Sequence, residues 1–159
     1  MNQAVVEEVR SVLIPLHECR LLLPNAVVAE VMDYLQPEPA GNASPTWFLG
    51  YLAWRGMMMP VVSFEGMRGD QVAIPGQRGR ILILNALGGH ERLSHIGLVV
   101  QSIPKLARVS AENVLPVNPE EGDQDPLVKQ QVELDLSPAI IPDLDEIERR
   151  VLEVVVKPS

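Results

Sequence analysis

Apolar residues occur along the chain in short runs that turn residues separate. Runs at 12–16 and 20–23 flank a short polar turn, and runs at 51–55 and 57–64 flank Gly56. Runs of this length, bounded by turn residues, are typical of strands. We therefore predict a hairpin at each of these two places.

The middle of the chain shows the same rhythm. The run at 80–85 is apolar at successive positions, which predicts a strand buried on both faces. Gly88–Glu91 is typical of a hairpin turn, and 95–103 is the expected return strand. Residues 105–110 are expected to continue that strand after a bend at Pro104.

The last part of the chain predicts two more strands and a helix. Residues 128–136 alternate in part, and 138–142 form an apolar piece framed by prolines. Asp143 fits a helix cap, because Glu146 stands where a capping box prefers an acidic residue. The expected apolar face of the helix consists of Leu144, Ile147, Val151 and Val154.

Three segments are less regular. Residues 26–34 fit either a helix or a half-turn that runs into a strand, and their β-branched residues favour the strand. Residues 47–50 fit one helical turn ended by Gly50. Pro60 predicts an edge position or a bulge within its strand.

Polar stretches with Pro or Gly are interpreted as loops. They cover 36–46, 65–80 and the acidic connection 112–125, in which we expect solvated Glu120, Glu121, Asp123 and Asp125. The total is nine or ten short strands, one C-terminal helix and no βαβ rhythm. This pattern predicts an all-β architecture of barrel type.

Charge and composition narrow the function classes. The net charge of −8, from 13 basic and 21 acidic residues, disfavours binding to nucleic acid or to an anionic membrane surface. No run reaches the roughly 18 apolar residues of a membrane span, so we predict no membrane insertion. The start MNQAVVEEVR has two glutamates where a signal peptide has Lys or Arg, and Cys19 is the only cysteine, so we expect a cytoplasmic protein.

No cluster of residues predicts catalysis or metal binding. His17, Glu18 and Cys19 are consecutive at an expected hairpin turn, so they cannot all face one metal ion. Nothing local pairs Cys19 with His90 or His95 as a nucleophile with its base. We therefore expect no enzyme activity, no cofactor and no bound metal.

Two features of the second hairpin suggest partner recognition. Arg55 lies between Trp54 and Gly56, where neighbouring carbonyls or carboxylates can hold an arginine for partner recognition; a plain surface arginine is the alternative. Alternation along a strand would bury one or two of the methionines at 57–59 and expose the rest. Exposed methionine suits an adaptable protein-binding surface, and core packing is the alternative.

The order of these landmarks is similar to that of a known family. Residues 50–64 (GYLAWRGMMMPVVSF) resemble the G-x-x-N-L-R-G-x-x-x-P-V-x-D-L stretch of CheW-like domains, the adaptors of bacterial chemosensory arrays. Residues 27–32 (VVAEVM) resemble the family's V-x-E-I, and 96–100 (IGLVV) resemble its I-G-L-x-V-D strand. With the closing region 132–144, the resemblance covers about residues 11–150.

The sequence departs from the family pattern at a few positions. The family has Asn, Leu, Asp and Asp where this chain has Ala53, Trp54, Ser63 and Gln101. These departures indicate a divergent adaptor, of a twitching-motility (type IV pili) or other alternative chemosensory cluster rather than the flagellar one.

The resemblance implies an all-β fold of two intertwined five-stranded SH3-like β-barrels with a short C-terminal helix, as a single domain over residues 1–159. It implies a non-catalytic scaffold in two-component signal transduction, without cofactor. The implied partners are the regulatory domain of a chemotaxis-type histidine kinase and the cytoplasmic tip of a chemoreceptor. Carried over position by position, the partner-binding residues are Val28, Glu30, Val31, Gly50, Arg55, Gly56 and Val99.

Two other function classes stay open on the residues alone. A regulatory β-barrel that binds a small ligand would need convergent polar groups, for which Arg55, Glu30 and Gln101 are candidates. A ligand-dependent melting shift without any partner would favour it. An enzyme would need Cys19 or a histidine, and alkylation of Cys19 without functional loss would exclude that class.

Overall fold

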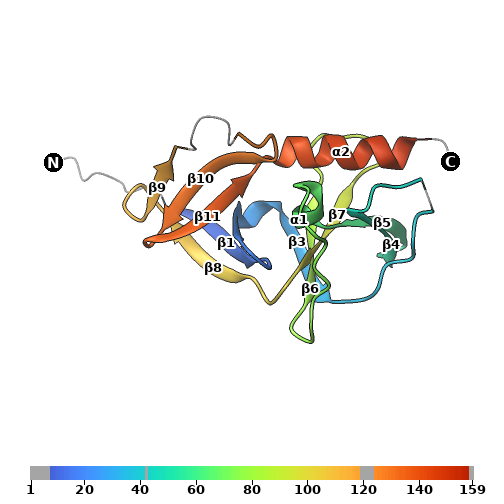
Figure 1. Ribbon diagram of the computed structural model, residues 1–159, viewed down its shortest axis with the longest axis horizontal. Coiled ribbons are helices and arrows are strands. Elements are labelled where there is room, and N and C mark those ends of the chain that lie inside the picture. Colours follow the sequence, from blue (N-terminus) through green and yellow to red (C-terminus); the bar gives the residue numbers. More distant parts are fainter. Residues whose placement is uncertain (1–7, 42, 119–123, 158–159) are drawn as a thin grey trace.

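A computed structural model describes residues 8–41, 43–118 and 124–157, in which eleven strands form two sheets (Figure 1). The first has the order β8–β1–β2–β11–β10–β9, with bounds Lys105–Val109, Val9–Pro15, Arg20–Pro24, Ser137–Pro142, Val128–Leu134 and Val114–Val117. The second has the order β3–β6–β7–β5–β4, with bounds Val28–Asp33, Arg80–Asn85, His95–Val100, Met57–Val62 and Phe48–Trp54. The helices are η1 (a 3₁₀ turn), α1 and α2, with bounds Asn25–Val27, Phe64–Met67 and Leu144–Val156.

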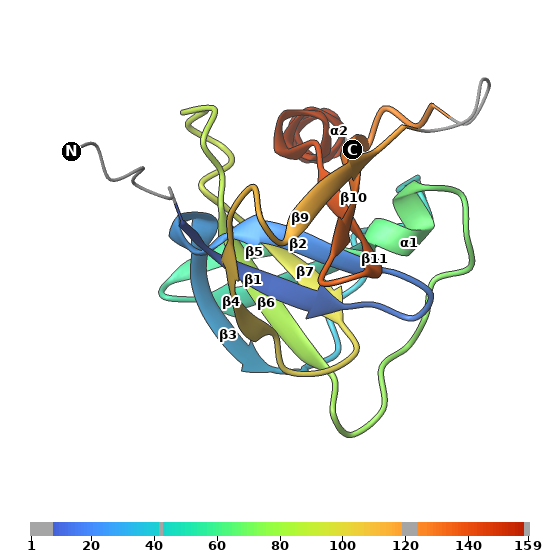
Figure 2. The ribbon, with the colours of Figure 1, turned by 90° about the vertical axis from the view of Figure 1, so that its left-hand side faces the viewer.

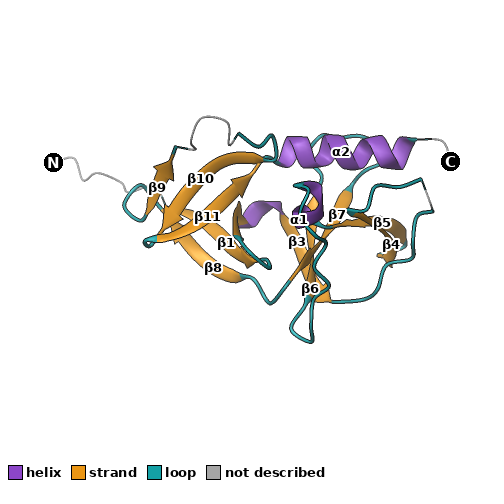
Figure 3. Ribbon diagram, viewed as in Figure 1, coloured by secondary structure: helices purple, strands orange, loops and turns teal. Residues whose placement is uncertain are grey.

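The two sheets exchange strands, which intertwines them. After the β1–β2 hairpin the chain crosses to the second sheet, where β3 pairs with β6. After the β6–β7 hairpin it crosses back, and β8 pairs with β1. Each sheet curls around an apolar interior of its own, and we call them the first and the second barrel (Figures 2 and 3).

One structural unit occurs twice. The hairpin β4–β5 followed by α1 is repeated, eighty residues later, by the hairpin β10–β11 followed by α2. Both hairpins have a register irregularity in their first strand, after Phe48 and after Val128. Ser63 and Asp143 cap the two helices, because each side chain accepts a hydrogen bond from the backbone N–H three residues on.

The largest apolar core lies between the barrels rather than inside either of them. It contains nineteen buried side chains from both barrels and from α2, whereas the interiors of the second and first barrels contain seven and four. Strand β6 supplies both kinds of core, since Leu82 and Leu84 face the shared core while Ile81 and Ile83 face the second interior. Separating the barrels would therefore expose the larger part of the buried apolar surface.

The predicted all-β class, the three hairpins, the half-turn with strand at 26–34 and the C-terminal helix are confirmed. Five local expectations were wrong. Residues 48–50 belong to strand β4, because Gly50 takes φ +138° and stays extended instead of ending a helical turn. Strand β5 lies inside its sheet, although Pro60 precedes the residues that pair with β7.

The other three concern two expected loops and one expected strand. The segment 65–80 begins with the rest of α1, which Ser63 caps. The connection 112–125 contains strand β9, and its residues Glu120, Glu121 and Asp123 lie outside the described residues. Asp125 is not a solvated loop residue as expected, because its side chain is 24% exposed and pairs with Arg68 at 2.8 Å. Residues 105–109 do not extend β7, because they pair with β1 in the other barrel.

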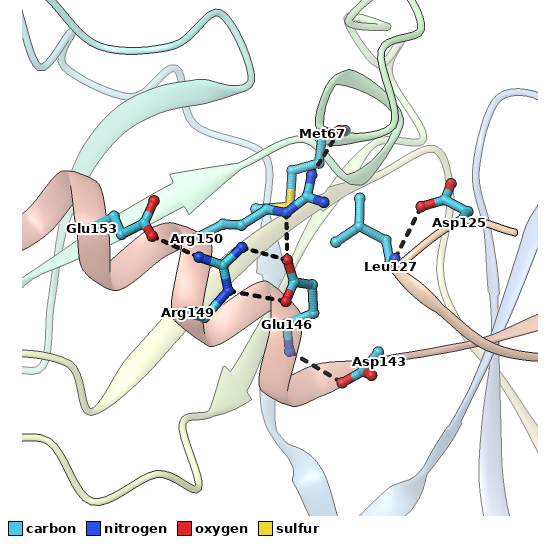
Figure 4. A network of polar contacts seen from close by, with 8 residues as sticks. All are labelled: Met67, Asp125, Leu127, Asp143, Glu146, Arg149, Arg150 and Glu153. Carbon is cyan, nitrogen blue, oxygen red and sulfur yellow. Dashed lines mark hydrogen bonds and ion pairs between the residues drawn. The ribbon is translucent and has the colours of Figure 1, made fainter.

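Polar contacts fasten α2 to α1 (Figure 4). Glu146 accepts hydrogen bonds from the guanidinium groups of Arg149 and Arg150, and Arg150 also donates to the carbonyl of Met67 at 3.3 Å. The hydrogen bond from Arg149 is the largest cause that lowers the pKa of Glu146 from 4.5 to about 2, followed by the bond from Arg150. Within the described residues, no helix is long and apolar enough to cross a membrane.

Candidate functional site

The tip of the β4–β5 hairpin is a two-residue turn with unusual backbone angles. Arg55 has φ +46° and Gly56 has φ +78°. Two successive residues with positive φ match the right-handed twist of the flanking strands. Glycine adopts this region without cost, whereas the side chain at Arg55 makes it uncommon there. The turn therefore presents the exposed Arg55 side chain at the extreme end of the hairpin.

Arg55 is held by two groups that come from different strands. Its Nη2 lies 3.2 Å from Oε1 of Glu30 on β3, and its guanidinium lies 4.5 Å from the ring centre of Trp54. Trp54 Nε1 donates to the other carboxylate oxygen of Glu30 at 3.0 Å. One carboxylate thus fixes both the arginine and the indole, and we call Glu30, Trp54, Arg55 and His95 the Arg55 corner.

His95 completes the corner from strand β7. Its ring lies 4.7 Å from the Trp54 ring in a tilted arrangement, and its Nδ1 is 3.0 Å from the hydroxyl of Ser94. Burial, and then the nearby positive charge of Arg55, lower the pKa of His95 below its ordinary value. His95 is therefore biased toward the neutral form, and Arg55 carries the positive charge of the corner.

The Arg55–Glu30 ion pair orients side chains more than it stabilises the fold. The side chains of Arg55 and Glu30 are 65% and 39% exposed. Exposed pairs contribute about 0–1 kcal/mol, because water screens them. An arginine carries five N–H donors, so several remain for another molecule after the bond to Glu30. The geometry suits recognition of an acceptor on a partner surface.

Apolar side chains accompany the corner. Val31 follows Glu30 on β3 and is 40% exposed, while Met57 and Met58 follow the turn and are 38% and 55% exposed. Met59 is buried in the interior of the second barrel. The prediction that alternation buries one or two of the three methionines and exposes the rest is therefore confirmed. The hairpin thus offers a cation beside flexible apolar side chains, a combination common at protein interfaces.

The structure does not bring all the proposed site residues onto this surface. Val28 is half-buried against the shared core, and Val99 is 3% exposed inside the second barrel. Gly50 is buried at the other end of β4, where an added Cβ would lie 1.9 Å from the carbonyl oxygen of Glu38. Glu30, Val31, Arg55 and Gly56 are the members of the set on or beside the corner.

The structure explains what two of the departures from the family pattern, Ser63 and Trp54, contribute. Ser63 accepts the capping hydrogen bond of α1, a role that the family's Asp can also fill. Trp54 adds a stacking surface and an N–H donor that a leucine lacks, and both act on the Arg55–Glu30 pair. For Gln101, Nε2 is buried and has no hydrogen-bond partner among the described residues.

His95 was missed as a site residue by sequence reasoning. The stack on Trp54 depends on β5 pairing in parallel with β7, a register between segments far apart in the chain. Trp54 was identified, but only as a departure from the pattern. The only local signal for His95 was its position at the start of a predicted strand.

The residues considered for catalysis do not form a reactive centre in the described part of the chain. Burial raises the pKa of the Cys19 thiol, and the nearby Arg68 opposes this only in part. A protonated thiol is a poor nucleophile. Across the described ranges, no group of three or more His, Cys, Asp or Glu side chains is placed to hold a metal ion.

Comparison with known proteins matches these features to one family. The model of the CheW-like domain family matches residues 10–151, and the chain belongs to that family. Among solved structures, the fold is similar to scaffolding protein TtCheW from Thermoanaerobacter tengcongensis, with a TM-score of 0.72 and 20% sequence identity. That match covers 91% of this chain and 90% of the other, so the expected pair of SH3-like barrels is confirmed, although the sheet of the first barrel has six strands rather than the expected five. No curated protein matches the sequence significantly.

Proposed function

We propose that this protein is a non-catalytic cytoplasmic adaptor that couples chemoreceptors to a chemotaxis-type histidine kinase. Membership of the CheW-like family over residues 10–151 carries this proposal. The likeness to a scaffolding protein along nearly the whole chain supports a scaffold role. The two barrels, joined by the shared core, would act as one domain that keeps its two partners in a fixed relation.

The Arg55 corner is the surface we assign to recognition. The free donors of Arg55 would pair with acceptors on the partner, while Met57 and Met58 would pack around that contact. Glu30 and Trp54 hold the guanidinium in place beforehand, which reduces the entropy lost on binding. Turnover of a signalling complex requires only a modest interface of this kind.

A receptor tip is a helical hairpin and would use a different feature. Amphipathic helices dock through apolar side chains into apolar grooves. Val28 is half-buried at the junction of the barrels, and Val31 and Leu35 near it on the chain are exposed. We assign this region of β3 to the receptor, beside the corner that meets the kinase.

The small-ligand alternative receives less support. Arg55 and Glu30 converge, but Gln101 follows β7 and its backbone N–H donates to Pro15 of the first barrel. Four cavities among the described residues are lined by residues other than these three.

The proposed function is tested by titrating the purified full chain with the regulatory domain of the kinase and with a receptor-tip fragment. We expect binding to each separately and a ternary complex when both are present. If the chain binds neither partner and its melting temperature shifts on adding small metabolites, the adaptor proposal is wrong and the small-ligand hypothesis is favoured.

A further inference from the structure

An open groove lies at the end of β4 opposite to the Arg55 corner. It runs between the loop before β4 and the last turns of α2, two segments that lie near each other in Figure 1, and has a volume of about 980 Å³. Trp47 and Tyr51 line it from β4 and the residue before it, and Val154 to Val156 line it from α2. Strand β4 connects the groove to the corner, since Tyr51 in the lining lies four residues before Arg55, roughly 13 Å along an extended strand.

The groove concentrates positive charge in an acidic protein. Its lining contains Arg92, Arg149, Arg150 and Lys157, against the single carboxylate of Glu153. The net charge of the whole chain is −8, so the groove has the opposite sign of charge to the chain as a whole. A cationic groove on an acidic surface attracts anionic groups and repels basic ones.

The four cations are not equivalent. Arg149 and Arg150 already bind Glu146, and Arg149 also binds Glu153, as Figure 4 shows. Arg92 and Lys157 are exposed and form no ion pair with any residue that the structure describes. These two are therefore the charges available to a ligand, whereas Arg149 and Arg150 are already paired with carboxylates.

The floor of the groove adds an apolar contribution. Trp47 and Tyr51 are half-buried, and each packs edge-on against Phe48, at 6.1 Å and 5.4 Å between ring centres. Val156 is 36% exposed at the end of α2. Aromatic and aliphatic surface beside unpaired cations suits a peptide that carries carboxylates and an apolar anchor.

We propose that this α2 groove docks an acidic segment of a partner protein, in extended form, with an apolar side chain against Tyr51 and Trp47. The groove is open along one side, which a peptide tolerates because it needs to bury only one face. The adaptor function does not require this surface, and the proposal stands on the charge and shape of the groove alone.

The test uses the full chain and a fluorescein-labelled peptide with a central phenylalanine flanked by three glutamates on each side. A peptide with glutamine in place of glutamate serves as the comparison. We expect anisotropy to report binding of the acidic peptide, weakened by salt, and at least about tenfold weaker binding of the glutamine peptide. Absence of binding by the wild-type chain would overturn the proposal.

Paired variants locate the binding. The double variant Arg92→Glu, Lys157→Glu should lose the acidic peptide by roughly tenfold or more, while Arg78→Glu, Lys129→Glu makes the same change in net charge outside the groove. An equal loss in both would mean that only net charge matters, and would overturn the proposal. A wild-type dimer abolished only by the groove variant would give the surface to a second copy instead. Unchanged kinase binding by the groove variant keeps this test separate from that of the adaptor function.

Discussion

The β4–β5 and β10–β11 hairpins share one backbone plan and differ at the tip. In both, the last three residues of the first strand are buried, exposed and buried, and a two-residue turn with positive φ follows. The second barrel places Arg55 and Gly56 in this turn, whereas the first barrel places Asp135 and Leu136 there. The repeated unit thus gives both hairpins the same backbone geometry, and the residues in the turn determine the charge, the backbone strain and the exposed side chains at each tip.

Strain separates the two tips. Gly56 has φ +78° and no side chain to oppose it, while Leu136 has φ +70° and is 86% exposed. A side chain in this backbone region costs on the order of 1–3 kcal/mol. Leu136 gains little from burial in return, so the first barrel carries strain at a position where the second barrel carries none.

The largest expected effect concerns the start of the two hairpins. Gly50→Ala would place a Cβ 1.9 Å from the Glu38 carbonyl oxygen at φ +138°, and we expect about 3 kcal/mol or more of destabilisation. Gln130→Ala changes the equivalent position and should cost only about 1 kcal/mol, through its lost hydrogen bonds to Val117 and Gln131. Urea unfolding measures both, and equal losses would contradict the difference assigned to Gly50.

Exchanging the turn residues comes next. Leu136→Gly should stabilise the protein by about 0.5–1 kcal/mol, since relief of strain exceeds the added flexibility of the unfolded chain. Gly56→Leu should destabilise it by about 1–2 kcal/mol for the opposite reason. If thermal melting shows the same sign for both variants, the strain argument is wrong.

A smaller effect is the pH dependence of the unfolding free energy, to which α2 contributes through Glu146 and for which α1 has no equivalent carboxylate. The pKa of Glu146 is lowered to about 2 in the folded protein, so its contribution to stability is present above pH 4.5 and is lost as the pH falls from there toward 2. Glu146→Gln should therefore flatten the dependence of unfolding free energy on pH in that window. The α1 helix has Gly66 at the equivalent position, and Gly66 cannot titrate. An unchanged slope in Glu146→Gln would show that the arginine contacts are absent in solution.

The smallest effect is electrostatic and local to the corner. Arg55→Ala removes one of the two causes that lower the pKa of His95, so that pKa should rise toward its ordinary value. Burial against Trp54 remains and should keep part of the shift. Titration of the His95 ring by NMR measures this, with Arg78→Ala as the control. A fall in the pKa would mean that the two side chains are not neighbours.

Local pattern was enough to predict the parts of the fold that depend on neighbouring residues. The runs at 80–85 and 95–100 pair with each other through a nearby turn, so their hydrophobicity and the glycines between them suffice. The exchange of β8 into the first barrel depends on pairing with β1, almost one hundred residues away, and no local signal carries it. Strand β9 is short and contains Pro116, and because proline is uncommon within strands the segment was predicted to be part of a loop.

The same distinction between local and long-range signals applies to the candidate site. Arg55 was first identified from its place in the turn and Glu30 was proposed as a partner-binding residue through the family resemblance, and the structure brings the two together. The buried place of Val99 follows from which face of β7 points inward, a matter of register that the motif does not encode. The requirement for glycine at position 50 comes from the segment around Glu38, which packs against β4.

The most direct test of the account compares Arg55→Glu with Arg78→Glu in titrations against the kinase regulatory domain and the receptor-tip fragment. Both variants change the net charge equally, and both should remain folded, because exposed substitutions usually cost about half a kcal/mol or less. Arg55→Glu deletes the donors and places a carboxylate beside Glu30, so we predict binding of the kinase regulatory domain weaker by roughly 1–3 kcal/mol, with Arg78→Glu unaffected. Undiminished binding of the kinase regulatory domain by a folded Arg55→Glu variant would contradict the assignment of the Arg55 corner as its recognition surface.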